Sequence, residues 1–128
     1  MIYLDTSVAL AHLLAEDRVP SEELWQEPLI SSRLIEYEIP TRIHALKLAR
    51  SHGDEVRSLL GRIALVELSL PVLARALEPF PKPVRTLDAI HLASMDFIRK
   101  QGQSITLASY DGRQISAARA LRFSIYAL

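Results

Sequence analysis

The chain has 128 residues, a length that suits one domain built around one hydrophobic core. Hydrophobic residues make up 49% of it and charged residues 23%, which is the profile of a globular rather than a disordered protein. No apolar run approaches the ~20 residues that span a bilayer, so we expect no membrane association. We expect no signal peptide either, because Asp5 interrupts the first apolar run early.

The chain contains no cysteine, which excludes disulfides and thiolate metal sites and is compatible with the reducing cytoplasm, where we expect the protein to act. Formal net charge is zero, but residues 1–60 hold ten acids and six bases, whereas residues 61–128 hold five acids and nine bases. This is not the strong basic excess of a protein that coats nucleic acid, so any nucleic-acid contact is expected to be local.

The first half of the chain alternates between strand and helix patterns. In chain order we predict a strand at 2–4, a helix at 8–15, a short helix from the N-cap Ser21 to 26, a strand at 28–31 and a long helix from 33 to about 51, capped by Ser32. Pro40 lies inside the long helix and should kink it or end its first segment, because proline lacks the N–H that a helix interior needs.

The second half continues the alternation. We predict a helix from Asp54 to about 63, a strand at 64–70, a short helix at 71–77, a stiff proline-rich loop at 78–85, a helix from the N-cap Thr86 to 100, a strand at 104–109, a helix opening at Asp111 and a last strand at 123–127. Strands that alternate with helices indicate an α/β fold with a parallel sheet covered on both faces.

Acidic residues stand where this architecture predicts a site. Asp5 and Asp111 each follow an apolar strand and precede a helix, so both should lie at the carboxyl edge of the sheet, where such folds bind ligands. Asp88 and Glu38 lie in apolar surroundings within helices, and the sequence pattern alone leaves open whether Asp88 faces the same edge. Each acid taken singly also fits an ordinary role as a helix cap, a first-turn acid or a solvated side chain.

Burying several carboxylates close together without a counter-charge is costly, and a divalent cation would remove that cost. Mg²⁺ or Mn²⁺ takes oxygen ligands, often one or two carboxylates with water and phosphate oxygens completing the shell. The acids therefore favour a metal site, with His91 either a general acid beside it or, as we prefer, a packing and hydrogen-bonding residue.

Four segments carry a resemblance to a known family: "MIYLDTSV", "SSRLIEYE", "RTLDAIHLAS" and "LASYDGRQISAARALRF". They resemble, in order and across the whole chain, the acidic motifs of PIN domains, and more narrowly those of VapC-type ribonuclease toxins. The resemblance implies a single PIN domain over 1–128, folded as a three-layer α/β/α sandwich with a central parallel sheet.

Carried over residue by residue, the resemblance implies that the catalytic acids are Asp5, Glu38, Asp88 and Asp111. Asp5, Asp88 and Asp111 would be the ligands of Mg²⁺ or Mn²⁺. Glu36 is a rival for the second acid, but Ser32, six residues before Glu38, matches the family pattern. Three residues are expected to contact the substrate or hold the carboxylates: Ser7, Ser109 and Arg85.

The implied function is metal-dependent hydrolysis of RNA phosphodiester bonds by the toxin of a VapBC-type toxin–antitoxin system. The implied partners are an RNA substrate, a VapB-like antitoxin laid over a groove near the first helices, and a second copy in a homodimer. Leu10, Leu13 and Leu14 are candidate groove residues, although core burial explains them equally well. The alternatives are a catalytically silent PIN-like module that binds RNA or protein, and a phosphotransfer or receiver domain. The latter fits poorly, because "DTSV" lacks the second acid of a phosphatase motif.

Overall fold

The computed structural model describes residues 1–128 and contains a five-stranded sheet in which all neighbouring strands are parallel. The strands are β1 (Ile2–Leu4), β2 (Leu29–Ser32), β3 (Ile63–Val66), β4 (Thr106–Ala108) and β5 (Ser124–Ile125). Their order across the sheet is β3-β2-β1-β4-β5. Strand order therefore reverses at β1, which lies between β2 and β4.

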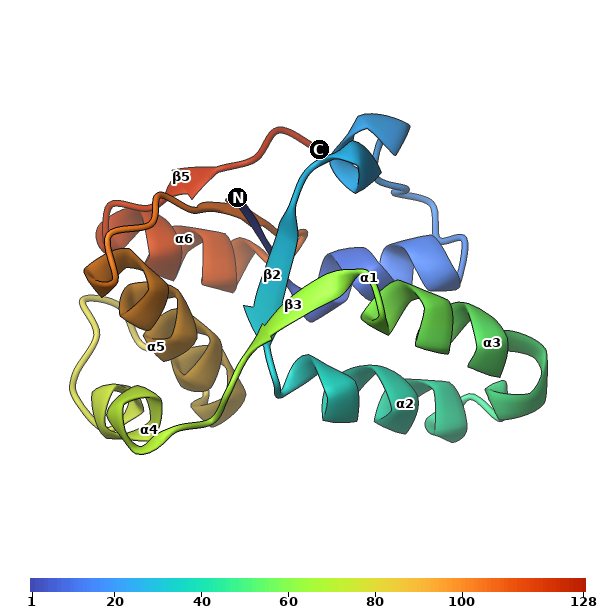
Figure 1. Ribbon diagram of the computed structural model, residues 1–128, viewed down its shortest axis with the longest axis horizontal. Helices are drawn as coiled ribbons and strands as arrows, with labels where there is room; N and C mark the ends of the chain where they lie inside the picture. The colour runs from blue at the N-terminus through green and yellow to red at the C-terminus, as the bar shows by residue number, and fades with distance from the viewer.

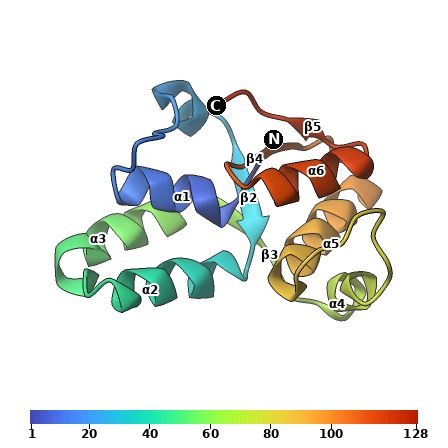
Figure 2. The same cartoon turned by 180° about the vertical axis from the view of Figure 1, so that it is seen from behind.

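Helices cover both faces of this sheet (Figure 1). The helices are α1 (Thr6–Leu13), the short 3₁₀ helix η1 (Glu22–Gln26), α2 (Ile35–Ala45), α3 (Ala49–Leu60), α4 (Leu70–Ala76), α5 (Thr86–Lys100) and α6 (Gly112–Ala120). Helices α1, α2 and α3 lie on one side and α4, α5 and α6 on the other, as the view from behind in Figure 2 also shows. The predicted α/β/α sandwich is confirmed. None of these helices has both the length and the apolar character needed to cross a membrane.

Two apolar clusters fill the space between the layers, one on each face of the sheet. Successive side chains of a strand point to opposite faces. Ile2 and Leu4 accordingly belong to the cluster under α1, α2 and α3, while Tyr3 between them belongs to the cluster under α5 and α6. Every residue of β1 is thus buried, which explains its uninterrupted apolar sequence.

The reversal of strand order brings two chain segments together at the carboxyl edge. Leu4 at the end of β1 pairs with Ala108 at the end of β4. The next backbone N–H, that of Asp5, donates to the Ala108 carbonyl at 3.0 Å. Asp5 and Ser109 therefore emerge from the sheet side by side, at the position where open parallel sheets form their binding crevices.

The predicted long helix at 33–51 is wrong, because the chain turns back between α2 and α3 at residues 46–48. Lys47 in this turn has a φ of 59°, a left-handed conformation that ends a helix. Pro40 does not end α2, although it lies inside the helix and removes one backbone hydrogen bond. Asp54 lies within α3 rather than at its start.

The remaining elements occur as predicted but with shifted bounds. The strand predicted at 64–70 ends at Val66, and those at 104–109 and 123–127 shrink to three and two residues. Asp111 caps α6, as expected. Ser32 and Thr86 are not helix N-caps: Ser32 ends β2 and accepts the Leu34 N–H, and Thr86 is already the first residue of α5.

Candidate active site

Asp5 is buried at the end of β1, and hydroxyl groups from two chain segments hold one of its carboxylate oxygens. Oδ2 accepts the Ser7 hydroxyl at 2.5 Å, the Ser7 N–H at 3.3 Å and the Ser109 hydroxyl at 2.9 Å. Oδ1 has no hydrogen-bond partner. A buried carboxylate with one oxygen fixed and the other free is suited to binding a cation.

The loop after β4 is tied to the same two hydroxyl groups. The Asp111 N–H donates to Ser109 Oγ at 2.9 Å, and the Tyr110 N–H donates to Ser7 Oγ at 3.0 Å. Asp111 itself caps α6, since its Oδ1 accepts the N–H groups of Arg113 and Gln114. Ser7 and Ser109 therefore set the position of Asp111 relative to Asp5, a role that fits their place in the acidic motifs.

Asp88 lies in the first turn of α5, close enough to Asp5 and Asp111 to interact with their charges. Burial, together with the charges of Asp111 and Asp5, raises the pKa of Asp88 above its ordinary value. The question that the sequence pattern left open is thus answered, because α5 begins at the same edge of the sheet as α1 and α6. No ion pair neutralises any of the three aspartates.

Glu38 lies on α2 and takes part in a buried chain of hydrogen bonds. Its Oε1 accepts the Thr6 hydroxyl at 2.9 Å and lies 2.6 Å from His91 Nε2, while His91 Nδ1 lies 2.7 Å from the Tyr3 hydroxyl. Glu36, the rival acid, instead pairs with Arg33 at 2.8 Å. Of the two glutamates, it is Glu38 that lies against the start of α1, next to Asp5.

The proton positions in this chain follow from chemistry. A carboxylate can only accept, so Nε2 of His91 carries the proton shared with Glu38. Burial by itself would lower the pKa of His91, but the hydrogen bond that His91 donates to Glu38 and the charges of Glu38, Asp5 and Asp88 raise it. Burial also raises the pKa of the Tyr3 phenol, which stays protonated. His91 is 2% exposed, so its side chain lies behind Glu38 and is closed to solvent.

Sequence reasoning missed Thr6, Tyr3 and Lys82. Thr6 lies inside "LDTSV", between the two motif residues Asp5 and Ser7. A hydroxyl at this position could have indicated a hydrogen bond to one of the acids. Tyr3 read as an apolar strand residue, although a buried phenol needs a hydrogen-bond partner.

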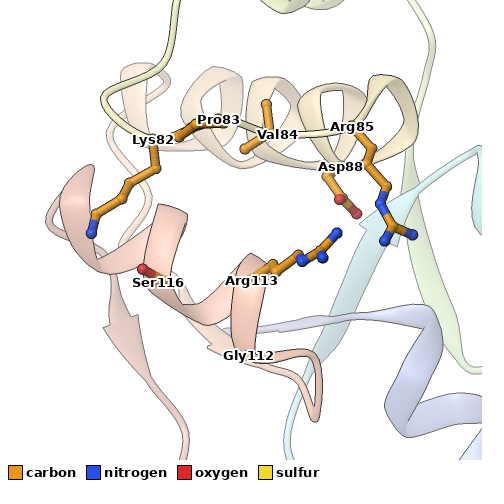
Figure 3. A pocket seen from close by; sticks show the side chains of 8 residues that line it. All are labelled: Lys82, Pro83, Val84, Arg85, Asp88, Gly112, Arg113 and Ser116. Carbon is orange, nitrogen blue, oxygen red and sulfur yellow. The ribbon is translucent and has the colours of Figure 1, made fainter.

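Arg85, which we expected to contact substrate, is exposed and lines a cavity of about 470 Å³ together with Asp88 and Lys82 (Figure 3).

The donor set suits a hard divalent cation, because Asp5, Asp88, Asp111 and Glu38 offer only oxygen. No three of the chain's His, Asp and Glu side chains are arranged closely enough to form a complete protein-only metal site. Mg²⁺ does not require one, since it is commonly held by one or two carboxylates with waters and phosphate oxygens in the other positions. The free oxygen of Asp5 and the uncompensated charge around Asp88 fit such a site.

A separate cavity of about 580 Å³, the α1–α2 cavity, lies between α1 and α2 beside Glu38. Its apolar lining includes Leu10, Leu34, Tyr37 and Leu87, and Tyr37 and Leu87 are exposed. Leu10 was one of three predicted groove residues. Leu13 is buried in the core and Leu14 packs against it, so core burial accounts for those two.

Comparison with known proteins agrees with the motifs. The chain matches the family described as PIN domain over residues 2–120. Ribonuclease VapC35 of Mycobacterium tuberculosis (strain CDC 1551 / Oshkosh) is 30% identical over 133 residues, covering 99% of this chain and 96% of that protein. Ribonuclease VapC47 of the same strain is 29% identical over 130 residues, covering 96% and 93%.

Proposed function

Because the chain belongs to the PIN domain family, as its motifs predicted, we propose that it is the endoribonuclease toxin of a VapBC-type toxin–antitoxin pair acting in the cytoplasm. We treat residues 1–128 as a single PIN domain. The observation that carries the proposal is the group of aspartates without ion-pair partners where strand order reverses. The alternative of a silent binding module is not favoured, since binding alone does not need these acids and both relatives carry ribonuclease names.

Asp5, Asp88 and Asp111 are the residues that would hold Mg²⁺ or Mn²⁺. Bound there, the ion would neutralise charge on the scissile phosphate and make a water molecule more acidic. The proposal is supported by the hydroxyl groups of Ser7 and Ser109, which fix one oxygen of Asp5 and leave the other free. It is also supported by the raised pKa of Asp88, because carboxylates that repel one another bind a cation favourably.

The reaction we propose is hydrolysis, in which the oxygen of water forms a bond to phosphorus and an ester P–O bond breaks. Glu38 is the residue we assign to orienting that water. Thr6 and His91 both hold its Oε1, which leaves Oε2 available. Arg85, exposed beside Asp88, is assigned to the substrate phosphate. Ser7 and Ser109 are assigned an indirect part in substrate binding, because they hold the Asp5 carboxylate that would bind the ion.

Cleavage of a structured RNA in Mg²⁺ or Mn²⁺ tests this function. We expect the wild type to cleave, and Asp5→Asn and Asp88→Asn to lose at least about 99% of the activity, in line with the loss of a large electrostatic contribution. Asp54→Asn is the matched control, because Asp54 is exposed on α3 and pairs only with Arg57. Cleavage that persists in a chelator, or in both site variants, would contradict the proposal.

We propose that a VapB-like antitoxin binds across the cavity between α1 and α2. The exposed side chains of Tyr37 and Leu87 offer an apolar contact surface beside Glu38. A partner bound to this surface would cover the acidic site. We also propose a homodimer. This is supported by the leucines at the two ends of α4: Leu70, its first residue, and Leu77, the residue after its last, are 83% and 89% exposed, and exposed apolar side chains that gather on one surface often mark interfaces.

A further inference from the structure

Two adjoining cavities form one continuous groove along α6. The first, of about 470 Å³, lies between residues 82–88 and the start of α6. The second, of about 590 Å³, continues along α6 to Arg119 and shares Lys82, Gly112 and Ser116 with the first. We call the combined space the α6 groove. It starts at the candidate catalytic Asp88 and leads away from the other acids.

Basic side chains line this groove along its whole length. Lys82, Arg85, Arg113 and Arg119 all contribute to it, and all four are exposed. Figure 3 draws Arg85 and Arg113 at the end that holds Asp88, with Lys82 at the opposite end of the first cavity. Asp88 is the only acid in the lining.

None of the four basic side chains has an ion-pair partner within the protein. Elsewhere the chain does pair its cations: Arg75, Arg99 and Lys100 all contact the single carboxylate of Asp96. Four unpaired cations along one groove create a positive potential that attracts a polyanion. This groove also accounts for part of the basic excess in residues 61–128.

We propose that the α6 groove binds the phosphate backbone of a single RNA strand that runs from the cleavage site along α6. This inference rests on the proposed ribonuclease function. From Arg113 to Arg119 the helix rises about 9 Å, so these two arginines reach different phosphates rather than one. Guanidinium groups suit phosphate oxygens because they offer paired donors in one plane.

The lining also indicates what the groove does not read. No Phe, Tyr, Trp or His lines it, so bases have no aromatic platform on which to stack. Contacts to phosphate position a strand but carry no sequence information. The groove therefore raises affinity equally for all sequences, and any base preference of the enzyme arises elsewhere.

The test measures binding of fluorescently labelled single-stranded RNA oligonucleotides of several sequences as a function of salt. The protein is the full chain carrying Asp5→Asn, which is expected to stop cleavage. Four phosphate contacts predict a slope of about −2.8 in log K against log salt, at about −0.7 for each phosphate of a single strand. Adding Arg113→Gln and Arg119→Gln should reduce the slope to about −1.4 and weaken binding roughly 20-fold at 0.1 M salt, by the same factor for every sequence.

The matched control replaces Lys47 and Arg50 by Gln. Both are exposed and unpaired near the turn between α2 and α3, on the other side of the sheet from α6 (Figure 1), so binding should not change. The groove assignment is overturned if the arginine variant binds RNA like the control, if its loss of affinity depends on RNA sequence, or if the Asp5→Asn protein with an intact groove binds no RNA. Cleavage separates the two proposals: a wild type that cleaves RNA while the arginine variant binds normally refutes the groove alone. Groove-dependent binding without any cleavage refutes the nuclease alone.

Discussion

Asp5 depends on two hydroxyl groups that come from opposite ends of the chain. Ser7 follows β1 and Ser109 follows β4, and both donate to the same carboxylate oxygen. Replacing a side chain that holds a metal-binding carboxylate typically lowers metal affinity or activity about 10- to 100-fold. We therefore propose that Ser7 and Ser109 contribute to the metal affinity without touching the metal.

Ser109→Ala tests this assignment at the level of one oxygen atom. The substitution removes the donor to Asp5 and the acceptor of the Asp111 N–H, so two proposed ligands lose their support at once. We expect the Mn²⁺ concentration needed for half-maximal cleavage to rise about 10- to 100-fold. Ser58→Ala, an exposed serine on α3 outside the acidic edge and the α6 groove, is the control. An unchanged Mn²⁺ requirement in Ser109→Ala would refute the role.

Tyr3→Phe tests the chain of hydrogen bonds behind Glu38. The change removes only the hydroxyl that contacts His91 Nδ1, and one such bond is worth about 1 kcal/mol. We expect kcat to fall about fivefold while the KM for RNA stays constant, because Tyr3 is fully buried and cannot reach substrate. Tyr126→Phe is the control; equal losses in both variants would show that the effect is on stability and not on Glu38.

Among the helices, α4 is linked to α5 by an ion pair between Arg75 and Asp96, away from the acidic edge. Asp96 on α5 is buried and lies 3.0 Å from Arg75 of α4, 2.8 Å from Arg99 and 3.2 Å from Lys100. Burial by itself would raise the pKa of Asp96, but the hydrogen bonds from Arg99, Lys100 and Arg75 lower it below its ordinary value. A buried carboxylate with three cationic partners is stabilising in its ionised form.

Asp96→Asn should therefore lower the free energy of unfolding by about 1.5–3 kcal/mol at pH 7, the range for hydrogen bonds to charged groups. A carboxyl whose native pKa is lowered contributes stability above the pKa of the unfolded state, near 4. That contribution is lost as the pH falls through the lower native pKa. Urea unfolding of both proteins from pH 7 down to pH 3 should show the difference shrinking below about pH 4; a constant difference would contradict this.

The elements also show where sequence reasoning works and where it fails. Buried strands and helix periodicity predict the order of elements and the parallel sheet, because both depend on local apolar patterns. The turn at Lys47 was missed because its left-handed residue is a lysine, with no glycine or proline to mark it. Pro40 gave the opposite error: we expected it to kink the helix or end its first segment, but α2 continues through it.

Some site residues can be located from local sequence pattern, and others depend on how distant elements pack. Asp5 and Asp111 follow from their positions after strands, without any knowledge of distant contacts. The closeness of Asp88 to them depends on how α5 crosses the sheet, which the residue pattern could not give and the family resemblance implied. Lys82, Arg113 and Arg119 come together only through the packing of the proline-rich loop on α6, so no sequence spacing identified the α6 groove.

At the scale of the whole molecule, the acidic edge lies between two surfaces of different chemistry. The apolar cavity between α1 and α2 adjoins Glu38, and the basic α6 groove adjoins Asp88. We propose that RNA binds along the basic α6 groove and that an antitoxin covers the apolar cavity. Separate surfaces for substrate and inhibitor mean that each can be altered without the other.

Ala45→Arg tests that separation. Ala45 is exposed and lines the far part of the α1–α2 cavity, so a long charged side chain there should obstruct a partner without reaching the acids. We expect affinity for the proposed VapB-like antitoxin to fall at least about tenfold, equivalent to about 1.4 kcal/mol. RNA cleavage should be unchanged, as should both properties in the control Ala49→Arg on α3. Normal antitoxin binding by Ala45→Arg would remove this cavity from the interface.

The convergence of distant acids on one divalent ion is the claim on which the rest depends, and a calorimetric Mn²⁺ titration measures it most directly. We expect the wild type to bind Mn²⁺, and Asp5→Asn, Asp88→Asn and Asp111→Asn each to weaken binding more than about tenfold, while Asp54→Asn does not. Wild-type protein that binds no Mn²⁺, or three variants that bind it as the wild type does, would contradict the account.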